Sequence, residues 1–403
     1  MRELDYIREG TSSFKKVNLA LFIAGVNTFA ILYCVQPLLE AFTREFSVSP
    51  SVSSLALSVT TIFLAVSMLV MGSLSEVWGR KGVMVVAMFA SSFFCLASAF
   101  VPDFYTLLLL RLVIGITLAG VPSIAMAYLG EEMAKSSLAK AIGIYISGNA
   151  FGAMAGRFLA GFLADLFNWQ TALFAIGMIS LAAAIAFYYL LRPSQHFQAK
   201  NLHFGELSRS LGVHLKSKPL LSLFGLGFLL LGSNVALYNF IGFELINRYQ
   251  VEAVYVNGVY LLFIIGMFSS VLIGRLVARI GQVYSLYTVF LLISCGTIVS
   301  LMDGVGFKII GLAQRLAFLA DIRLRAVLAE WQMQIKRKHP LYLLMYYAGS
   351  SVGGTLAGVF WGQIGWAGVV IVVNGFMVIG IWLIRWFSKT TRLEIEQDKA
   401  SSV

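Results

Sequence analysis

Long apolar stretches recur along almost the whole chain, and they constrain its fold more than any single residue does. A helix needs about 20 consecutive apolar residues to cross the hydrocarbon core of a bilayer. Eleven stretches of that length are clear, and their spacing calls for a twelfth near 305–327. The eleven lie near 17–39, 52–74, 82–101, 104–129, 139–163, 170–191, 220–242, 254–277, 283–302, 341–363 and 368–387. Because 59% of the residues are apolar and 12% are charged, we predict an all-α integral membrane protein with 12 transmembrane helices, embedded in a lipid bilayer.

The basic residues predict the orientation of these spans, because Lys and Arg concentrate in cytoplasmic loops. With a cytoplasmic N-terminus and twelve spans, 22 of the 30 Lys and Arg residues fall in cytoplasmic segments. Three fall on the opposite side, namely Arg44, Arg248 and Lys308. We therefore predict a multi-pass protein of the inner, cytoplasmic-type membrane with both termini in the cytoplasm. The net charge of +11 is spread over these loops, which argues against a nucleic-acid partner.

One connection is longer than the others and divides the chain. Residues 192–219 follow the sixth predicted span and are basic and poor in apolar residues. Two short patterns recur across this segment. The first, Gly72-x-Leu74 with Gly79, returns 202 residues later as Gly274-x-Leu276 with Gly281; the second, Gly148 with Gly152, returns 201 residues later as Gly349 with Gly353. We predict two pseudo-symmetric six-helix halves, 1–191 and 220–403, joined by a cytoplasmic linker, 192–219.

The loop after the second predicted span carries a recognisable signature. It contains Gly72, Leu74, Glu76, Gly79, Arg80 and Lys81. This pattern resembles the G-x-L-x-D-x-x-G-R-K motif of the major facilitator superfamily, with Glu in place of the usual Asp. In the fourth span, Leu107, Arg111 and Gly115 are similar to the family's second motif. The resemblance covers nearly the whole chain and points to the 12-span bacterial efflux permeases. It implies the major facilitator fold and a secondary active transporter that moves a small-molecule substrate by alternating access, with no cofactor.

The resemblance also implies which residues gate the protein. In the family, the loop after the second span holds the cytoplasmic side closed through charge contacts, and such contacts suit an element with two states. We therefore expect the motif residues, together with Gly274 and Gly281 in the second half, to form a gating loop. Glu76 would pair with a basic group of a neighbouring helix. The alternative is that Arg80 and Lys81 only anchor the topology.

Two arginines inside apolar spans are the strongest functional signal, because a guanidinium in hydrocarbon costs about 2.5–3.5 kcal/mol even on insertion scales. Arg111 and Arg157 would lie on the order of 10 Å from the outer surface on adjacent antiparallel helices. They could reach one aqueous cavity and favour anionic or strongly hydrogen-bonding solutes. The alternative is a structural role in which each arginine snorkels or pairs with, for example, Asp165 or Glu40.

The family lines its central cavity with spans one, four, seven and ten. The resemblance therefore implies further substrate-cavity residues, namely Asn27, Tyr33, Gln36, Tyr238 and Asn239. Proton coupling usually requires a titratable group in the membrane. Glu40 and Glu244 are the carboxylates available for that role, and the fifth span lacks the proline of the antiporter signature. Coupled and uncoupled transport both stay open.

Small residues in two spans predict close helix contacts. They are Gly148, Gly152 and Gly156 in the fifth span and Gly349 and Gly353 in the eleventh. Cys34, Cys95 and Cys295 lie in apolar stretches without metal-ligand spacing. We read these cysteines as small buried hydrophobic residues and expect no metal site. No catalytic motif is present either, so we expect a monomeric transporter and not an enzyme.

The predicted tenth span is anomalous. From Gln314 to His339, eight of 26 residues are Lys, Arg, Asp or Glu. Such an abrupt change between two normal stretches is typical of a local misreading of the frame, and a divergent amphipathic helix is the alternative. A competing functional hypothesis follows, in which the chain is a transport-inactive membrane sensor or a degenerate family member.

Overall fold

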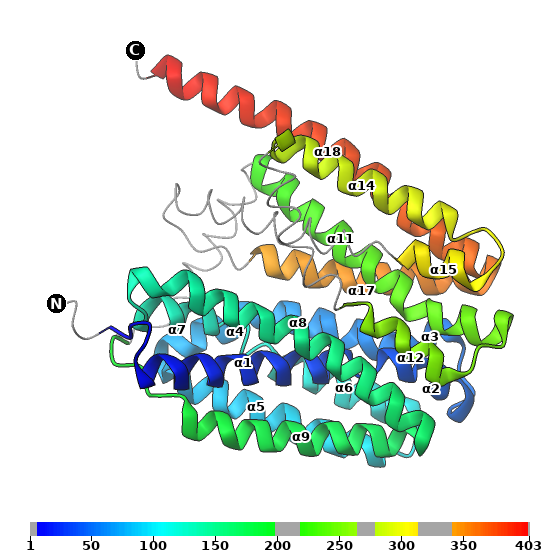
Figure 1. The fold of residues 1–403 in the computed structure, drawn as a ribbon, viewed down its shortest axis with the longest axis horizontal. Coiled ribbons are helices and arrows are strands. Elements are labelled where there is room, and N and C mark those ends of the chain that lie inside the picture. Colours follow the sequence, from blue (N-terminus) through cyan, green and yellow to red (C-terminus); the bar gives the residue numbers. More distant parts are fainter. Residues whose placement is uncertain (1–5, 198–217, 264–278, 313–340, 402–403) are drawn as a thin grey trace. The chain divides into compact units, whose positions relative to one another are not determined.

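The structure is a computed structural model that describes residues 6–197, 218–263, 279–312 and 341–401, and almost all of these are helical (Figure 1). The backbone contacts divide the chain into two units. Unit 1 comprises residues 1–202 and 251–264, and unit 2 comprises residues 203–250 and 265–403. The prediction of an all-α membrane fold is confirmed for the residues that the structure describes, whereas most of the doubtful tenth span, including 314–339, lies outside them.

Unit 1 is a bundle of long helices that run along one another (Figure 1). The helix α1 packs against α8 and α9, α4 packs against α6, and α5 packs against α6 and α9. Its elements are α1 (Ser12–Tyr33), η2 (Gln36–Leu38), α2 (Leu39–Glu45), α3 (Pro50–Ser53), α4 (Leu55–Trp78), α5 (Arg80–Ala97), η3 (Ser98–Phe100), α6 (Phe104–Leu118), α7 (Ala125–Glu132), α8 (Lys135–Leu166), α9 (Trp169–Leu190) and α12 (Ala253–Leu261).

Unit 2 is built on α11, which packs against α17 and α18. The helix α14 packs against α15 and α18. The elements are α11 (Lys218–Phe243), the π-helical segment η4 (Glu244–Arg248), α14 (Gln282–Val299), α15 (Val305–Leu312), α17 (Leu341–Ile364) and α18 (Trp366–Ser401). The second part of the predicted eighth span, residues 264–277, lies outside the described residues.

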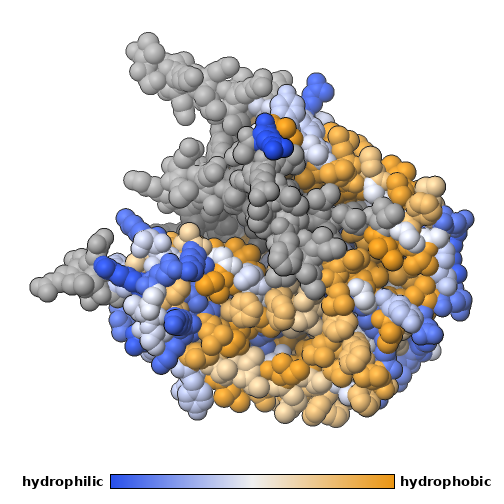
Figure 2. Space-filling model, in the orientation of Figure 1, coloured by the Kyte–Doolittle hydropathy of each residue, from blue (hydrophilic) through white to orange (hydrophobic). Residues whose placement is uncertain are grey.

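Length and apolar composition fit a bilayer. Seven described helical segments are long and apolar enough to cross one: Ser12–Glu45, Pro50–Trp78, Arg80–Phe100, Trp169–Leu190, Leu220–Arg248, Tyr342–Ile364 and Trp366–Ser388. Large apolar side chains such as Val66, Phe93 and Trp382 are exposed on helix faces, where lipid would cover them. On unit 1, Figure 2 shows apolar side chains along the flank of the helices and hydrophilic ones at the two ends.

The fourth span differs from its prediction as one continuous helix over 104–129. The helix α6 ends at Leu118, a turn occupies residues 119–124, and α7 begins at Ala125. Pro122 lies inside this turn and cannot donate the backbone hydrogen bond that a helix requires. The turn is buried and hydrogen-bonds to itself, with the amides of Gly120 and Ala125 bound to the carbonyls of Thr117 and Val121. Non-helical backbone is therefore satisfied within the protein at this point.

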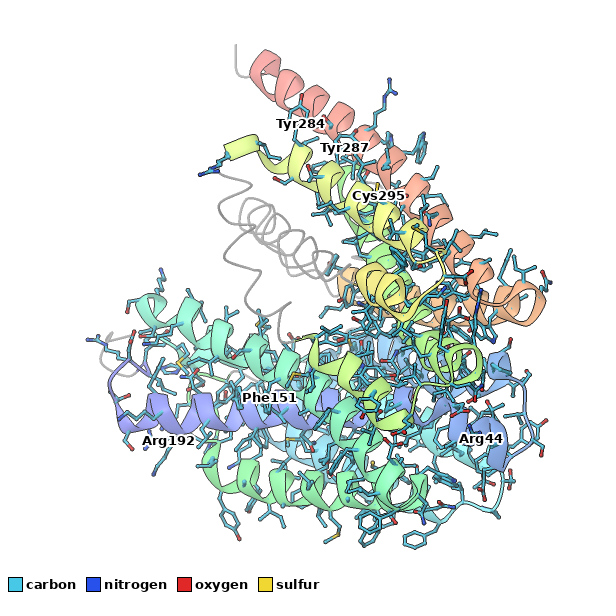
Figure 3. The ribbon with its side chains drawn as sticks, turned by 45° about the vertical axis from the view of Figure 1, so that its right-hand side comes forward. Arg44, Phe151, Arg192, Tyr284, Tyr287 and Cys295 are labelled. Carbon is cyan, nitrogen blue, oxygen red and sulfur yellow. The ribbon has the colours of Figure 1, made fainter. Side chains whose placement is uncertain are left out.

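Side chains cap the N-termini of several helices. The Asp103 carboxylate accepts a hydrogen bond from the Thr106 amide at the start of α6, and this bond lowers the pKa of Asp103. Thr11 caps α1 in the same way by accepting from the Phe14 amide. Cys34 and Cys95 are buried as predicted, whereas Cys295 is exposed. The prediction for Cys295 is wrong because its side chain points outward from α14 (Figure 3).

Candidate transport site and charge clusters

The motif after the second span forms the tight turn between α4 and α5. Gly79 stands between the two helices with φ of +88°, a conformation that residues with a Cβ rarely adopt. Leu74 packs against the hydrophobic core of unit 1. A Cβ on Gly72 would meet nothing within 4 Å. The motif therefore combines one conformationally required glycine, one packing residue and the charged residues that follow.

Arg80 is the centre of a buried charge cluster at this end of unit 1. Its guanidinium binds both carboxylate oxygens of Glu131 from α7, at 2.7 and 3.2 Å. It also donates to the Ser75 hydroxyl at 2.6 Å. Glu76 lies farther away, at 3.7 Å. Because Arg80 is only 6% exposed, the bidentate pair with Glu131 is its principal contact.

Lys81 connects the same turn to the end of the sixth span. Its ammonium group donates to the Leu191 carbonyl and lies 5.1 Å from the centre of the Tyr188 ring. The Phe197 ring lies 5.8 Å from the Arg80 guanidinium. Arg80 and Lys81 therefore hold the turn against α7, α9 and the chain that follows α9, in addition to any effect they have on topology.

Arg111 binds the backbone at the end of α1. Its three donor nitrogens reach the carbonyls of Ala56, Ile31 and Leu32 at 2.9–3.1 Å. The last carbonyls of a helix have no partner within the helix, and two of these acceptors belong to that final turn of α1. Arg111 is 1% exposed, so its guanidinium has a structural explanation that requires no substrate.

Arg157 reaches the same end of α1 from α8. It donates to the Gln36 side-chain oxygen and to the Ala153 carbonyl. Its guanidinium carbon lies 3.9 Å from the centre of the Tyr33 ring and 4.6 Å from that of Phe263. Cation–π contacts of this kind stabilise a desolvated guanidinium by about 2 kcal/mol. The structure thus brings Arg157, Tyr33 and Gln36 together in unit 1.

The suggested acidic partners of the two arginines make other contacts. Glu40 pairs with Arg44, and Asp165 accepts a hydrogen bond from Asn257 on α12. Arg111 binds backbone carbonyls and neither of these carboxylates.

Asn27 is the least satisfied of the predicted cavity residues. It is 2% exposed on α1, and both its amide nitrogen and its amide oxygen have no hydrogen-bond partner. Tyr238 and Asn239 are also buried, on α11 in unit 2, and both make contacts there. Each buried polar group without a partner costs about 1–3 kcal/mol, so Asn27 marks a position where stability has not been maximised.

The glycines of the fifth and eleventh spans lie at close helix contacts inside their own units. A Cβ on Gly148, Gly152 or Gly156 would come within 2.3–2.6 Å of the α1 backbone. In unit 2, a Cβ on Gly349 or Gly353 would come within 2.0–2.3 Å of the α11 backbone. The pair α8 with α1 therefore has a counterpart in the pair α17 with α11. Gly281 begins α14 with φ of +80°, while Gly274 lies outside the described residues.

Lys308, which we assigned to the outer side in counting basic residues, lies in a helix and is buried. It sits inside α15, is 1% exposed, and places its ammonium 3.1 Å from the Glu244 carboxylate. It also donates to the Ser300 carbonyl at 2.7 Å. The rings of Tyr249 and Trp366 flank it at 5.7 and 5.6 Å. Glu244 is consequently part of a buried ion pair.

Sequence reasoning missed several polar residues at the Arg80 end of unit 1. Glu131 binds Arg80. The carboxylate of the adjacent Glu132 accepts a hydrogen bond from the backbone amide of His196 at 2.9 Å and lies 3.3 Å from the Nδ1 atom of the His196 ring. Two consecutive acidic residues among predicted cytoplasmic segments rich in Lys and Arg were the available signal. The position of His196 beside them follows only from the path of the chain after α9.

Comparison with known proteins agrees with these features. A sequence model of the Major Facilitator Superfamily matches residues 19–319. The uncharacterized MFS-type transporter YybF of Bacillus subtilis (strain 168) is 47% identical over 396 residues, covering 97% of this chain and 98% of YybF. The inner membrane transport protein YnfM of Escherichia coli (strain K12) is 38% identical over 383 residues, covering 93% and 91%.

The fold is also that of solved transporters. The crystal structure of a bacterial homolog to the human lysosomal transporter Spinster, in an inward-facing and occupied conformation, aligns with a TM-score of 0.73 at 15% identity. The alignment covers 95% of this chain and 98% of the Spinster homolog. The helical fold and the matching sequences together define a multi-pass membrane protein of the transporter class. The chain belongs to the Major Facilitator Superfamily, as its loop motif predicted.

Proposed function

We propose that the protein is a secondary active transporter of the inner membrane. It moves a small solute that carries hydrogen-bonding groups, by alternating access and in the outward direction, with both termini in the cytoplasm. Family membership supports the transport class. The outward direction rests on the resemblance of the chain to the 12-span efflux permeases, and the choice of membrane rests on the name of the relative YnfM.

The observation that carries the proposal is the buried, unpartnered amide of Asn27. Native proteins satisfy the great majority of buried polar groups, so an amide left without a partner is best explained by a ligand or water that binds it. An amide offers two donors and one acceptor. It would therefore bind a solute with hydrogen-bonding groups and leave a purely apolar solute without a contact.

Arg157, Tyr33 and Gln36 supply a second set of recognition groups at the end of α1. The guanidinium lies over aromatic rings, and these rings reduce the cost of desolvating the charge. A solute with an acceptor group could compete for the guanidinium with Gln36, which now accepts from it. Within unit 2, the family resemblance makes Tyr238 and Asn239 on α11 further candidates for contact with the solute. Arg111 is left out of this proposal because each of its three nitrogens already donates to a backbone carbonyl.

The Arg80 cluster would supply the gate. Its bidentate pair with Glu131 joins the α4–α5 turn to α7, and ion pairs at a helix end can break and re-form without opening a hydrophobic core. Loss of this pair would shift the population of states and leave most of the fold intact.

The test begins with ligand detection and continues with transport. The purified protein is screened against small organic solutes for a rise in melting temperature, because a ligand at 100 times its Kd stabilises by about 2.7 kcal/mol. Solutes that stabilise the protein are then assayed in inside-out vesicles with and without a proton gradient. In inside-out vesicles, uptake of the solute corresponds to outward transport in the cell, so uptake that requires the protein supports the proposed direction. Dependence of this uptake on the proton gradient establishes proton coupling.

Asn27→Leu provides the specific control for the site, since leucine has the same branched side-chain skeleton and no polar group. We expect loss of solute stabilisation with an unchanged or raised melting temperature of the free protein. If no solute is transported by a well-folded protein, or if Asn27→Leu binds and transports as the parent does, the proposed site is wrong.

A further inference from the structure

The chain before α1 runs against the segment that joins α7 to α8 (Figure 1). The Ile7 amide donates to the Glu132 carbonyl at 2.9 Å, and the Ile7 carbonyl accepts from the Ala134 amide at 3.0 Å, which makes a parallel bridge. The Ile7 side chain packs against the hydrophobic core of unit 1. We call residues 6–9 the strap. It fixes the end of α7 to the start of the described chain, although 125 positions separate Ile7 from Glu132.

The strap also acts on Glu132 through a histidine that follows α9. The Glu132 carboxylate accepts a hydrogen bond from the His196 amide at 2.9 Å and lies 3.3 Å from Nδ1 of the His196 ring. The Tyr6 ring of the strap stacks on that ring, with a centroid separation of 4.4 Å and an angle of 4° between the planes. Glu132 is therefore held twice, directly by the strap at its carbonyl and through His196 at its carboxylate.

Glu132 is the direct neighbour of a residue of the gate proposed above. Glu131 binds the Arg80 guanidinium with both carboxylate oxygens, and the strap pairs with the backbone one residue further along the chain. The chain after α9 meets the gate at the same place, since the Phe197 ring lies 5.8 Å from the Arg80 guanidinium. A shift of the end of α7 that withdraws Glu131 from Arg80 would therefore also strain the contacts of Glu132 with the strap.

The strap is joined to α1 by a residue suited to a hinge. Gly10 has φ of +88°, and a Cβ there would meet nothing within 4 Å. Hinges are a few residues at the ends of elements that absorb changes in backbone dihedral angles, and glycine does so at low steric cost. The helix α1 begins directly afterwards with its own cap, Thr11, so the strap can leave while α1 stays formed. The ion pair of Glu9 with Lys140 is exposed and holds the strap only weakly.

From these contacts we propose that the strap restrains the gate. While it is docked, it holds the end of α7 so that Glu131 stays on Arg80, and its release about Gly10 lets the end of α7 move. Docking of the strap and closure of the gate then favour each other, as two coupled sites must. The proposal gives the chain before α1 a regulatory function, and it rests on the proposed role of the Arg80–Glu131 pair as a gate.

The experiment measures how fast a cysteine at the gate is labelled in the full-length protein in detergent, and it needs no transported solute. Ser75→Cys supplies the cysteine, because the Ser75 hydroxyl is buried and accepts from Arg80 at 2.6 Å. Cys295→Ser removes the exposed native thiol. A water-soluble maleimide is the probe, and mass spectrometry counts the label at position 75. Glu131→Gln should raise the labelling rate, which establishes that position 75 reports on the gate.

Release of the strap should open the gate. Gly10→Ala strains the hinge conformation without adding a side-chain contact, so we expect the labelling rate to rise about fivefold or more, the lower end of typical couplings between two sites. Gly143→Ala is the matched control. It makes the same change at a glycine of α8 that also has nothing within 4 Å of its Cβ position, and it should leave the rate unchanged.

Fixing the strap should have the opposite effect. Neighbouring strands lie about 4.7–4.9 Å apart, within the range of about 4.4–6.8 Å between the Cα atoms of a disulfide. Ile7→Cys combined with Met133→Cys should therefore cross-link across the bridge when oxidised. We expect the oxidised protein to be labelled at position 75 about five times more slowly than the same protein before oxidation.

The outcomes separate the strap from the gate. If the cross-link leaves the labelling rate unchanged, or if Gly10→Ala and Gly143→Ala are labelled alike, the strap does not restrain the gate. If the cysteine pair fails to cross-link in a folded protein, the strap does not dock as described. If Glu131→Gln itself does not raise the labelling rate, the gate proposed above is wrong, and the proposal for the strap falls with it.

Discussion

Gly79 and Gly281, 202 residues apart, adopt the same left-handed backbone conformation, with φ of +88° and +80°, and each immediately precedes a helix. The helices α5 and α14 therefore begin in the same way in the two units. A repeated pattern of glycines in the sequence here corresponds to a repeated turn.

Replacement of either glycine by alanine should destabilise the protein by about 1–3 kcal/mol, because this positive φ with an extended ψ is a conformation that essentially only glycine adopts. A Cβ would meet nothing within 4 Å at either position, so the effect isolates backbone conformation. Gly72→Ala is the control, because Gly72 lies within α4 with open space around its Cα; it should be neutral or stabilising. Thermal melting in detergent measures all three, and equal melting temperatures would contradict the argument.

The Arg80–Glu131 pair should control transport through its charge. We expect Arg80→Glu and Glu131→Arg each to lower transport at matched protein abundance, and the double exchange to restore part of it. Glu76→Ala should have a smaller effect, because its carboxylate lies at 3.7 Å and is 41% exposed. Vesicle transport normalised to protein amount measures the series. Full activity in both single variants would assign the motif to topology alone.

Arg111 should behave as a structural residue. Arg111→Met keeps an unbranched, flexible side chain but leaves three backbone carbonyls without donors. Bonds to a charged donor contribute about 1.5–3 kcal/mol each, so abundance and melting temperature should both fall. Arg111→Lys should recover only part of the loss, since one ammonium cannot reproduce the planar fork. A stable Arg111→Met protein that fails to bind solute would instead return Arg111 to the binding site.

Close helix packing should make Gly152 sensitive to a single methyl group. A Cβ there would lie 2.3 Å from the Val26 carbonyl oxygen, and the resulting overpacking should cost about 1–3 kcal/mol. Gly143, on the same helix, has nothing within 4 Å of its Cβ position, so Gly143→Ala should be harmless. The comparison of their melting temperatures tests whether α8 contacts α1 as described.

The Glu244–Lys308 pair should show strong coupling between its members. Lys308→Met or Glu244→Gln alone removes one partner from a buried ion pair, which typically costs about 3–5 kcal/mol when a charge is left uncompensated. The double variant should be more stable than the sum of the single effects predicts. A double-mutant cycle on melting temperature measures the coupling. Additive effects would mean that the two charges do not interact.

The sequence was informative wherever one local rule decided the structure. Apolar length predicted the helices, and the spacing of Gly79 and Gly281 predicted the related turns. It failed at the fourth span, where Pro122 interrupts a stretch whose apolar composition alone favours one helix. The apolar composition of a stretch does not show that the proline within it cannot donate a backbone hydrogen bond.

The partners of charged residues were the least predictable part of the site. Arg80 and Glu131 are 51 positions apart, and Lys308 and Glu244 are 64 apart. Nothing local connects such pairs, because each depends on how two helices pack. Arg111 was recognised as unusual from its position in an apolar span. Its acceptors are backbone carbonyls, which every residue carries, so the sequence does not show which of them the arginine binds. The close contacts of α8 with α1 were easier, since small residues at regular steps are visible in the sequence.

The chain before α1 forms a parallel β-bridge with the segment after α7, through Ile7 and Met133. This contact has a consequence for biosynthesis. The first described residues of the chain contact the end of α7, the segment that follows it, and His196 after α9. The N-terminus leaves the ribosome first, yet Ile7 can pair with Met133 only after four predicted spans have been made, and Tyr6 can stack on His196 only after six. A bulky fusion placed directly before Tyr6 would hinder this last step of assembly, whereas one joined through a long spacer would leave it free.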